Sequence, residues 1–387
     1  MNKKAVFPLI LLTVLLYAWP PGQWFQTGGT TAARFAEILP SPSSIHGRGE
    51  PFKEEEFIDA PGNMQVHAAS IAELKDNTLA AVWYGGQYEG SPDTQVYFTT
   101  RAMGKNWTPP AGIVNRASAS KELNRYIKKI GNPLVFTDRD DRLVLLFVTV
   151  SFGGWSGSSL NLKVSSDRGK TWSRSQRLTL SPFFNVSQLV RNNPLRLTDG
   201  GFVVPIYNEF IGIFSELLWL RPGGGEHAPV YFKTRLTWGT QYLQPAIVGL
   251  APGSAVVFLR SRRANSRIAV SFSDDTGGTW TAPRYIDLPN PGSGLNGLPL
   301  SGGRILLAFN DSSIHRDNLS LAVLKEYPTE HTERAAILEN TPGEEFSYPY
   351  MIRSSDGKIH LVYTWQRKRI KHVVFNEEWI EKNLNDE

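Results

Sequence analysis

Short apolar runs recur along most of this chain, and a turn rich in Asp or Gly separates each pair of runs. Residues 132–136 form one such run, residues 138–141 a polar turn, and residues 143–148 the next run. Apolar runs of this length, bounded by turn residues, predict β-hairpins whose strands are buried. The pattern therefore favours an all-β fold.

The hairpin pattern occurs six times, at intervals of about fifty to sixty-five residues. The first strands open with residues able to form hydrogen bonds, namely His67, Asn132, Asn193, Gln244, Asn296 and Tyr348. Six repeats of this kind predict the four-stranded blades of a six-bladed β-propeller. The six opening residues then form a ring at one end, which predicts a polar pocket. The alternative is that Asn-Pro simply begins a strand well. A strand near Phe57 is expected to close the ring by joining the last blade.

Two eight-residue segments share the pattern Ser-x-Asp-x-Gly-x-Thr-Trp. They are residues 165–172 and 273–280, in the second and fourth repeats. Asp and Ser cap their own backbone in tight turns, and Gly accepts a positive φ. The segments therefore predict identical hairpin turns, each with a Trp placed to pack against a neighbouring repeat.

Composition agrees with a large β-sheet protein. The chain has 387 residues, with 11 Trp, 13 Tyr, 20 Phe, 34 Gly and 25 Pro. It has no Cys, which excludes disulfides, thiolate nucleophiles and Cys-ligated zinc. The net charge of +5 is mild. The basic run at residues 367–372 is interpreted as a solvated strand edge rather than a nucleic-acid site.

The N-terminus differs from the rest of the chain. Lys3 and Lys4 precede an apolar run over residues 5–19, which is typical of a secretory signal or a short membrane anchor. Residues 1–22 are assigned to this segment, residues 23–55 to a linker and residues 56–387 to the propeller. We expect an exported protein, periplasmic or extracellular, that meets a membrane only through this segment.

The two eight-residue segments match the Asp-box of the sialidase (neuraminidase) superfamily. From about Met64 to Trp379 the chain resembles the predicted bacterial neuraminidase group with BNR repeats. The resemblance is carried by residues 67–70, 83–90, 288–295 and 363–372. It implies a six-bladed propeller whose Asp-boxes stabilise the outer rim and take no part in chemistry. No cofactor is implied, and no metal site is expected.

A sialidase-like site holds a substrate carboxylate with three Arg, attacks with a Tyr that a Glu activates, and uses an Asp as acid and base. The resemblance assigns the nucleophile to Tyr348 and two of the arginines to Arg260 and Arg316. It assigns the acid/base to Asp93. Arg binds a carboxylate through two parallel hydrogen bonds, and a carboxylic acid can protonate a leaving oxygen.

Two positions depart from the family pattern. His67 stands where sialidases have the first Arg, and Gln244, sixteen positions before Arg260, stands where they have the activating Glu. Gln cannot accept a proton, whereas His can act as acid or base near neutral pH. Glu89 is a second carboxylate that can take the acid role.

The resulting hypothesis is a sialidase-like glycosidase that removes a terminal acidic sugar, a sialic, nonulosonic or uronic acid, from a glycan. Asn132, Asn193 and Asn296 are expected to bind substrate beside Glu89 and the two arginines. Two alternatives stay open. One is a uronic-acid lyase that uses His67 and Tyr348, and the other is a glycan-binding propeller without catalysis.

Overall fold

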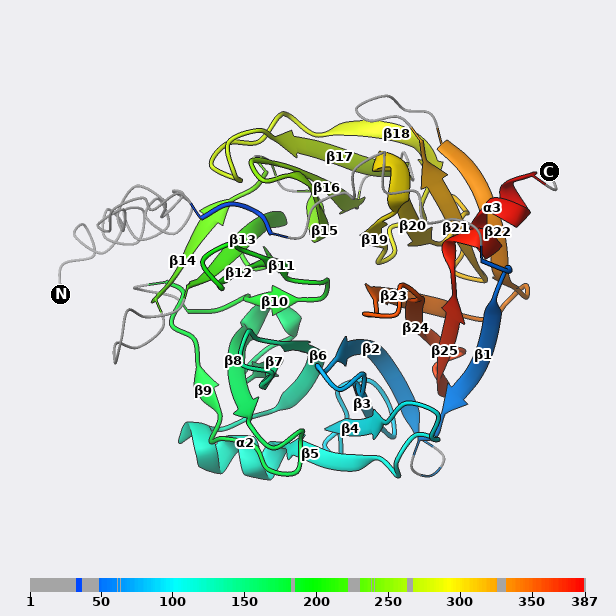
Figure 1. The fold of residues 1–387 in the computed structure, drawn as a ribbon. Coiled ribbons are helices and arrows are strands. Elements are labelled where there is room, and N and C mark those ends of the chain that lie inside the picture. The colour runs from blue at the N-terminus through cyan, green and yellow to red at the C-terminus, as the bar shows by residue number, and fades with distance from the viewer. Residues whose placement is uncertain are drawn as a thin grey trace, which may run out of the picture.

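The computed structural model describes residues 33–36, 49–60, 62, 64–181, 185–221, 230–237, 239, 241–262, 267–325 and 332–385. Within these ranges, six antiparallel sheets stand around a common axis as a β-propeller (Figure 1). The all-β, six-bladed prediction is confirmed. The predicted signal or anchor helix at residues 1–22 lies outside the described residues. No described helix has the length and apolar character needed to cross a membrane.

Each blade runs outward from the axis in chain order. The first blade contains β2 (Gln65–Glu73), β3 (Leu79–Gly86), β4 (Gln95–Arg101) and β5 (Ala111–Asn115), followed by α2 (Arg116–Leu123). The second contains β6 (Lys129–Thr137), β7 (Leu143–Val150), β8 (Ser158–Ser165) and β9 (Gln176–Arg177). In the third, β10 (Leu189–Val190) and β11 (Leu195–Arg196) share the innermost position, before β12 (Phe202–Asn208), β13 (Phe214–Arg221) and β14 (Val230–Arg235).

The remaining blades repeat this order. The fourth contains β15 (Tyr242–Ala251), β16 (Ser254–Ser261), β17 (Arg267–Ser273) and β18 (Arg284–Pro289). The fifth contains β19 (Asn296–Pro299), β20 (Ile305–Phe309), β21 (Asn318–Leu324) and β22 (Thr332–Asn340). The sixth contains β23 (Phe346–Arg353), β24 (Ile359–Trp365) and β25 (Arg369–Phe375), and α3 (Glu377–Asn385) follows it. Two single-turn 3-10 helices lie at η2 (Trp155–Gly157) and η3 (Ser301–Gly303).

The ring closes through a strand from the N-terminal side of the chain. β1 (Lys53–Ile58) pairs with β25 as the outermost strand of the sixth blade, as expected for the region of Phe57. It starts three residues before the expected domain boundary at Glu56. Phe35, inside the expected linker, forms a bridge with Leu197 and donates its N–H to the Pro252 carbonyl at 2.9 Å. Parts of the expected linker therefore belong to the folded body.

The core lies between the blades, where their apolar faces meet. Phe136 of the second blade packs on Phe202 of the third, with ring centroids 4.8 Å apart. Trp83, Phe147 and Phe258 are fully buried on middle strands. Each sheet is covered on both faces by its neighbours, which explains why the strands read as continuous apolar runs.

Both Asp-boxes form the predicted turn with the same bonds. In the first, Asp167 accepts hydrogen bonds from the Thr171 backbone N–H at 2.8 Å and the Thr171 hydroxyl at 2.6 Å. The Gly169 N–H donates to the Ser165 hydroxyl at 2.8 Å. The hydrogen bonds from Thr171 and from the Ser165 hydroxyl lower the pKa of Asp167 to about 2. Trp172, partly buried, packs edge-on against Phe98 of the first blade.

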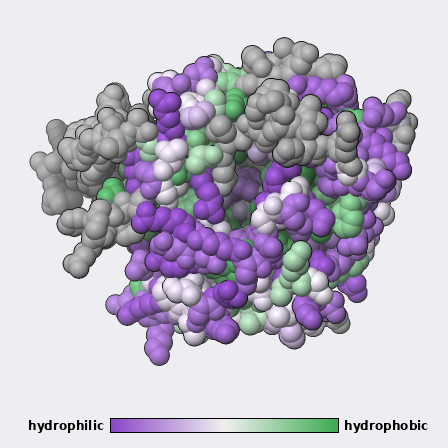
Figure 2. All heavy atoms as spheres, viewed as in Figure 1, coloured by the Kyte–Doolittle hydropathy of each residue, from purple (hydrophilic) through white to green (hydrophobic). Residues whose placement is uncertain are grey.

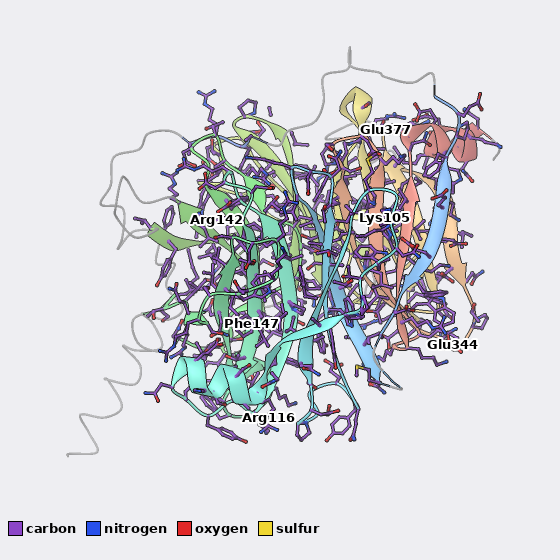
Figure 3. All side chains as sticks on the ribbon, turned by 60° about the horizontal axis from the view of Figure 1, so that its bottom comes forward. Lys105, Arg116, Arg142, Phe147, Glu344 and Glu377 are labelled. Carbon is purple, nitrogen blue, oxygen red and sulfur yellow. The ribbon has the colours of Figure 1, made fainter. Side chains whose placement is uncertain are left out.

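The two ends of the propeller are distinct. Figure 3 shows Arg116 and Glu344 toward one end and Lys105, Arg142 and Glu377 toward the other. Arg116 follows β5, and Glu344 lies just before β23 begins. We call this first end, where the innermost strands begin, the mouth. The Asp-box turns follow the ends of β8 and β17, away from the mouth.

A buried hydrogen-bonded chain crosses the sixth blade. The His360 Nε2 contacts the Ser354 hydroxyl at 3.0 Å, and its Nδ1 contacts the His372 Nε2 at 3.0 Å. The His372 Nδ1 lies 2.8 Å from the Glu56 carboxylate on β1. Burial, together with the neighbouring His372, lowers the pKa of His360 to about 3. Burial also lowers the pKa of His372, against the opposing effect of Glu56.

Replacing Trp172 by Ala is expected to reduce stability and leave the mouth intact. Trp172 is partly exposed, so the loss should be about 2–3 kcal/mol, below the value for a fully buried aromatic. Urea unfolding measures it. An unchanged unfolding midpoint would show that the Trp172–Phe98 contact does not hold the blades together.

Acidification is expected to destabilise the protein through His360. Its folded-state pKa lies below the unfolded value near 6.5, so the unfolded state binds the proton more tightly. The stabilisation is complete above about pH 6.5 and is lost as the pH falls toward 3, by about 2–3 kcal/mol at about pH 4.5. Urea unfolding at about pH 6.5 and at about pH 4.5 should show a smaller loss of unfolding free energy in His360→Gln than in the wild type. His315→Gln, at an exposed site, is the control. Equal losses in all three proteins would refute the assignment.

Candidate functional site

Four innermost strands carry the same bulge near their first residues. The register of β2, β6, β15 and β23 shifts at this point. One residue in each has a positive φ, namely Ala68 (54°), Asn132 (45°), Gln244 (49°) and Tyr348 (56°). This backbone costs a non-glycine residue about 1–2 kcal/mol. Bulges of this kind re-aim side chains and gather near functional sites.

The bulges correct one member of the predicted ring. Ala68, and not His67, occupies the position equivalent to Asn132, Gln244 and Tyr348. His67 lies one residue earlier and still faces the site, because its ring packs edge-on against Tyr348 with centroids 4.6 Å apart. The other three strands have Pro directly after this position, whereas the first strand has Ala69, so the sequence offered no marker that fixed its alignment.

His67 lies in an environment that disfavours its charged form. It is buried, and its Nδ1 has no hydrogen-bond partner among the described residues. Burial, reinforced by the positive charges of Arg367, Arg191 and Arg316, holds the pKa of His67 well below its usual range. His67 therefore does not replace the cation that sialidases carry at this position.

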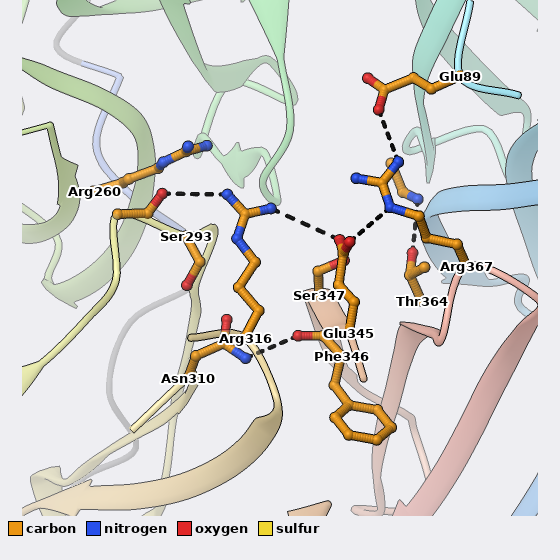
Figure 4. A network of polar contacts seen from close by, with 12 residues as sticks. Glu89, Arg260, Ser293, Asn310, Arg316, Glu345, Phe346, Ser347, Thr364 and Arg367 are labelled. Carbon is orange, nitrogen blue, oxygen red and sulfur yellow. Dashed lines mark hydrogen bonds and ion pairs between the residues drawn. The ribbon is translucent and has the colours of Figure 1, made fainter. Parts of the chain in front are cut away.

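Two arginines meet at one carboxylate in the mouth. Arg367 donates through Nε to Glu345 at 2.6 Å, and Arg316 Nη1 lies 3.8 Å from the same carboxylate (Figure 4). The other side of Arg367 contacts Glu89 at 3.0 Å. Burial alone would raise the pKa of Glu345. The hydrogen bond and the charge of Arg367 outweigh this effect and keep the pKa below its usual range. We call Arg260, Arg316 and Arg367 the arginine cluster; the close-up in Figure 4 shows Arg316 between the other two.

Arg367 reaches the cluster from a strained turn. Gln366 (φ 52°) and Arg367 (φ 56°) both occupy the left-handed region between β24 and β25. Asn and Gly usually fill such a hairpin turn. Here the Gln366 N–H donates to the Glu345 carbonyl at 2.7 Å, and the Val66 N–H donates to the Arg367 carbonyl at 2.9 Å. Sequence reasoning missed Arg367 because it treated the basic run as a strand edge. A hairpin turn without Asn or Gly was the available signal.

Arg260 and Gln244 contact each other across the β15–β16 hairpin. The Arg260 Nη1 donates to the Gln244 Oε1 at 3.0 Å, and the Gln244 Nε2 donates to the Tyr207 hydroxyl at 3.2 Å. Asn132 also donates to Tyr207, at 3.5 Å. Gln244 is thus held between a cation and a phenol. A Cβ on Gly294 would lie 3.2 Å from the Gln244 Oε1 and 2.9 Å from the Tyr348 ring, so only glycine fits between them.

Arg191 lies beneath the site and was not predicted. Only 2% of its surface is exposed. It donates through Nη1 to the Ala69 carbonyl at 3.0 Å and through Nη2 to the Tyr348 carbonyl at 2.5 Å. Its guanidinium also lies 5.0 Å from the centroid of the Tyr348 ring. Burial lowers the pKa of Arg191 to about 10.

Asn193 and Asn296 use their amides to connect blades. Asn193 donates to the Met351 carbonyl at 2.6 Å, and Asn296 donates to the Asn193 Oδ1 at 2.7 Å. The Met351 N–H donates to the Asn296 Oδ1 at 3.1 Å. These contacts favour a role in holding the third, fifth and sixth blades together.

A hollow of about 460 Å³ lies on the far side of these asparagines. Asn193 and Tyr350 line it, together with Arg196 and Arg353. Figure 2 views the propeller from the end opposite the mouth, where hydrophilic residues predominate around a central depression. The segment that contains Arg191 and Asn193 therefore lies between this hollow and the mouth.

The two candidate acids lie on the loop between β3 and β4 but face different surroundings. Asp93 is exposed, accepts a hydrogen bond from the Gln87 N–H at 3.1 Å and lines a hollow with Arg116 and Tyr126. Hydrogen bonding to Ser91 lowers the pKa of Asp93. Among the described residues Asp93 forms no ion pair, whereas Glu89 pairs with Arg367. Glu89 is therefore the carboxylate of this loop that belongs to the arginine cluster.

Residues 77–361 match the sequence model of the BNR repeat-like domain family. The chain belongs to this family. No curated protein matches the chain. In the ranges that the structure describes, no three His, Asp or Glu side chains are grouped so as to hold a metal ion.

Solved structures share the propeller at low sequence identity. A protein of unknown function from Dyadobacter fermentans has a TM-score of 0.67 and 14% identity over 84% of this chain and 98% of its own. The NanB sialidase of Streptococcus pneumoniae has a TM-score of 0.64 and 12% identity over 85% and 71% of the two chains. A leech intramolecular trans-sialidase has a TM-score of 0.65 and 15% identity over 89% and 72%. These likenesses confirm the sialidase-like fold.

Replacing Glu345 by Gln is expected to leave Arg316 and Arg367 with excess positive charge. Stability at low salt should fall by about 1–2 kcal/mol, because the pair is half-buried. Added acetate should then raise the melting temperature of the variant more than that of the wild type, since an external carboxylate can replace the lost one. Glu344→Gln, one residue away, is the control. An acetate response that matches the wild type would show that the arginines do not form an anion site.

Proposed function

We propose that the protein is a sialidase-type glycosidase that removes a terminal acidic sugar, a sialic, nonulosonic or uronic acid, from a glycan. The observation that supports this most is the arginine cluster at one mouth of the propeller. Tyr348 is its neighbour, since a Cβ on Gly294 would meet both Tyr348 and the Gln244 that Arg260 bonds. The sialidases among the similar structures support the same substrate class. An exported location remains a prediction from the N-terminal sequence.

The arginine cluster provides the recognition of the acid group. Guanidinium groups bind carboxylates with two parallel hydrogen bonds, and an anionic sugar is favoured where several converge. Arg367 supplies the third guanidinium that the first innermost strand lacks, since His67 replaces the family's Arg there. The Arg316–Glu345 separation of 3.8 Å leaves donors of Arg316 for a ligand.

The chemistry proceeds through Tyr348. Its oxygen attacks the anomeric carbon and forms a bond to the sugar while the bond to the leaving oxygen breaks. A carboxylic acid gives its proton to that leaving oxygen, and water then cleaves the sugar from Tyr348. Sialidases are known to use a Tyr in this way instead of a second carboxylate. Glu89 is the nearer candidate for the acid role by position, since it contacts Arg367 of the arginine cluster and Asp93 does not.

One observation favours a second candidate, glycan binding without catalysis. Gln244 is fixed between Arg260 and Tyr207, so no carboxylate occupies the position that activates the nucleophile in sialidases. The lyase alternative needs a base, and the low pKa of buried His67 makes it a weak one.

The deciding experiment incubates the full chain with a panel of acidic glycans and their neutral analogues. Release of a free acidic sugar supports the glycosidase. The ultraviolet absorbance of an unsaturated uronate would indicate the lyase. Binding with neither product would leave the glycan-binding function.

Arg316→Ala and Arg367→Ala are each expected to weaken binding of acidic sugars by about 2–5 kcal/mol, because a desolvated charge pair is broken. Neutral analogues should bind as before. Arg142→Ala, an arginine at the opposite end of the propeller, is the matched control. Calorimetry measures the affinities. Equal losses for acidic and neutral sugars would make the two arginines structural.

A further inference from the structure

Arg191 is a buried cation with no acidic partner. Its side chain is 2% exposed, and among the described residues no carboxylate lies within ion-pair distance of it. Its Nε also has no hydrogen-bond partner among these residues. An uncompensated buried charge is costly, so a fold that keeps one must gain something from it.

The surroundings of Arg191 show which group benefits from its charge. The guanidinium lies 5.0 Å from the ring centroid of Tyr348 and 5.9 Å from that of Tyr350. It also donates to the Tyr348 carbonyl at 2.5 Å. Tyr350 is almost fully buried, whereas Tyr348 is partly exposed at the mouth. Tyr348 is therefore the ring through which this charge can act on a ligand.

The position of Tyr348 is tightly fixed. Its backbone adopts a φ of 56°, Arg191 holds its carbonyl, and His67 packs against its ring. Gly294 leaves room for the ring on another side. The guanidinium lies 5.0 Å from the centroid of this fixed ring, and an electrostatic interaction between a cation and negative charge on the ring is strong where water is excluded.

We propose that Arg191 is the positioning residue that stabilises negative charge on the Tyr348 oxygen, in place of the carboxylate that Gln244 cannot supply. The phenol proton leaves to water at the mouth, and the resulting phenolate attacks. The attack of Tyr348 on a sugar rests on the proposed function, whereas the effect of Arg191 on the charge of Tyr348 is independent of that function.

Nitration by tetranitromethane tests the charge effect directly, because this reagent attacks the phenolate. Arg191→Met removes the charge and keeps an apolar side chain of similar length, a replacement that buried charges often tolerate without loss of stability. Mass spectrometry of the Tyr348 peptide should show nitration slowed by about tenfold to a hundredfold. Tyr88, 56% exposed, is the internal control and should react at the wild-type rate.

Arg191→Lys should restore part of the Tyr348 reactivity, because it keeps a positive charge. If Arg191→Met does not fold, Arg191→Gln, which also removes the charge, replaces it and should slow nitration of Tyr348 as well. Unchanged nitration of Tyr348 in a folded variant without the charge would overturn the proposal.

Kinetics separate this inference from the proposed function. On the best substrate of the panel, Arg191→Met should lower kcat with little change in KM, and the acidic limb of the rate profile should move to higher pH. Wild-type kcat and an unmoved profile would overturn the role of Arg191. If the wild type releases no sugar, the proposed function fails, while the nitration result still decides whether Arg191 acts on Tyr348.

Discussion

The hydrogen bonds that residues 191–193 make across the axis are the interaction on which the rest of the structure depends. Arg191 reaches carbonyls of the first and sixth blades, Asn192 reaches the Gln244 carbonyl of the fourth, and Asn193 reaches the sixth again. A regular innermost strand cannot reach three other blades with three consecutive side chains, which explains why the third blade splits into β10 and β11. One segment thus links the blades and supports the base of the mouth.

Most of the fold follows from local sequence. Each hairpin is encoded by apolar runs and a turn, and the bonds of Asp167 to Thr171 use residues four positions apart. Such contacts are visible in a linear pattern. The ring closure near Phe57 was also predictable, because a propeller without it leaves an open edge. The early start of β1 and the packing of Phe35 were not, since both depend on partners far along the chain.

The site was less predictable because its contacts connect different blades. The pairing of Arg260 with Gln244 follows from spacing within one hairpin. Arg367 and Arg191 gain their roles only from distant partners, Glu89 and Tyr348. His67 was misplaced by one position because the first innermost strand has Ala69 where the other bulged strands have Pro, so nothing in its sequence marked the bulge.

The described N-terminal segments contact one end of the propeller. Lys53 pairs with Phe375, at the end of β25 away from the mouth, and Phe35 contacts Pro252 in a turn at that same end. Both described N-terminal segments therefore contact the propeller at the end opposite the mouth, and neither of them covers Tyr348.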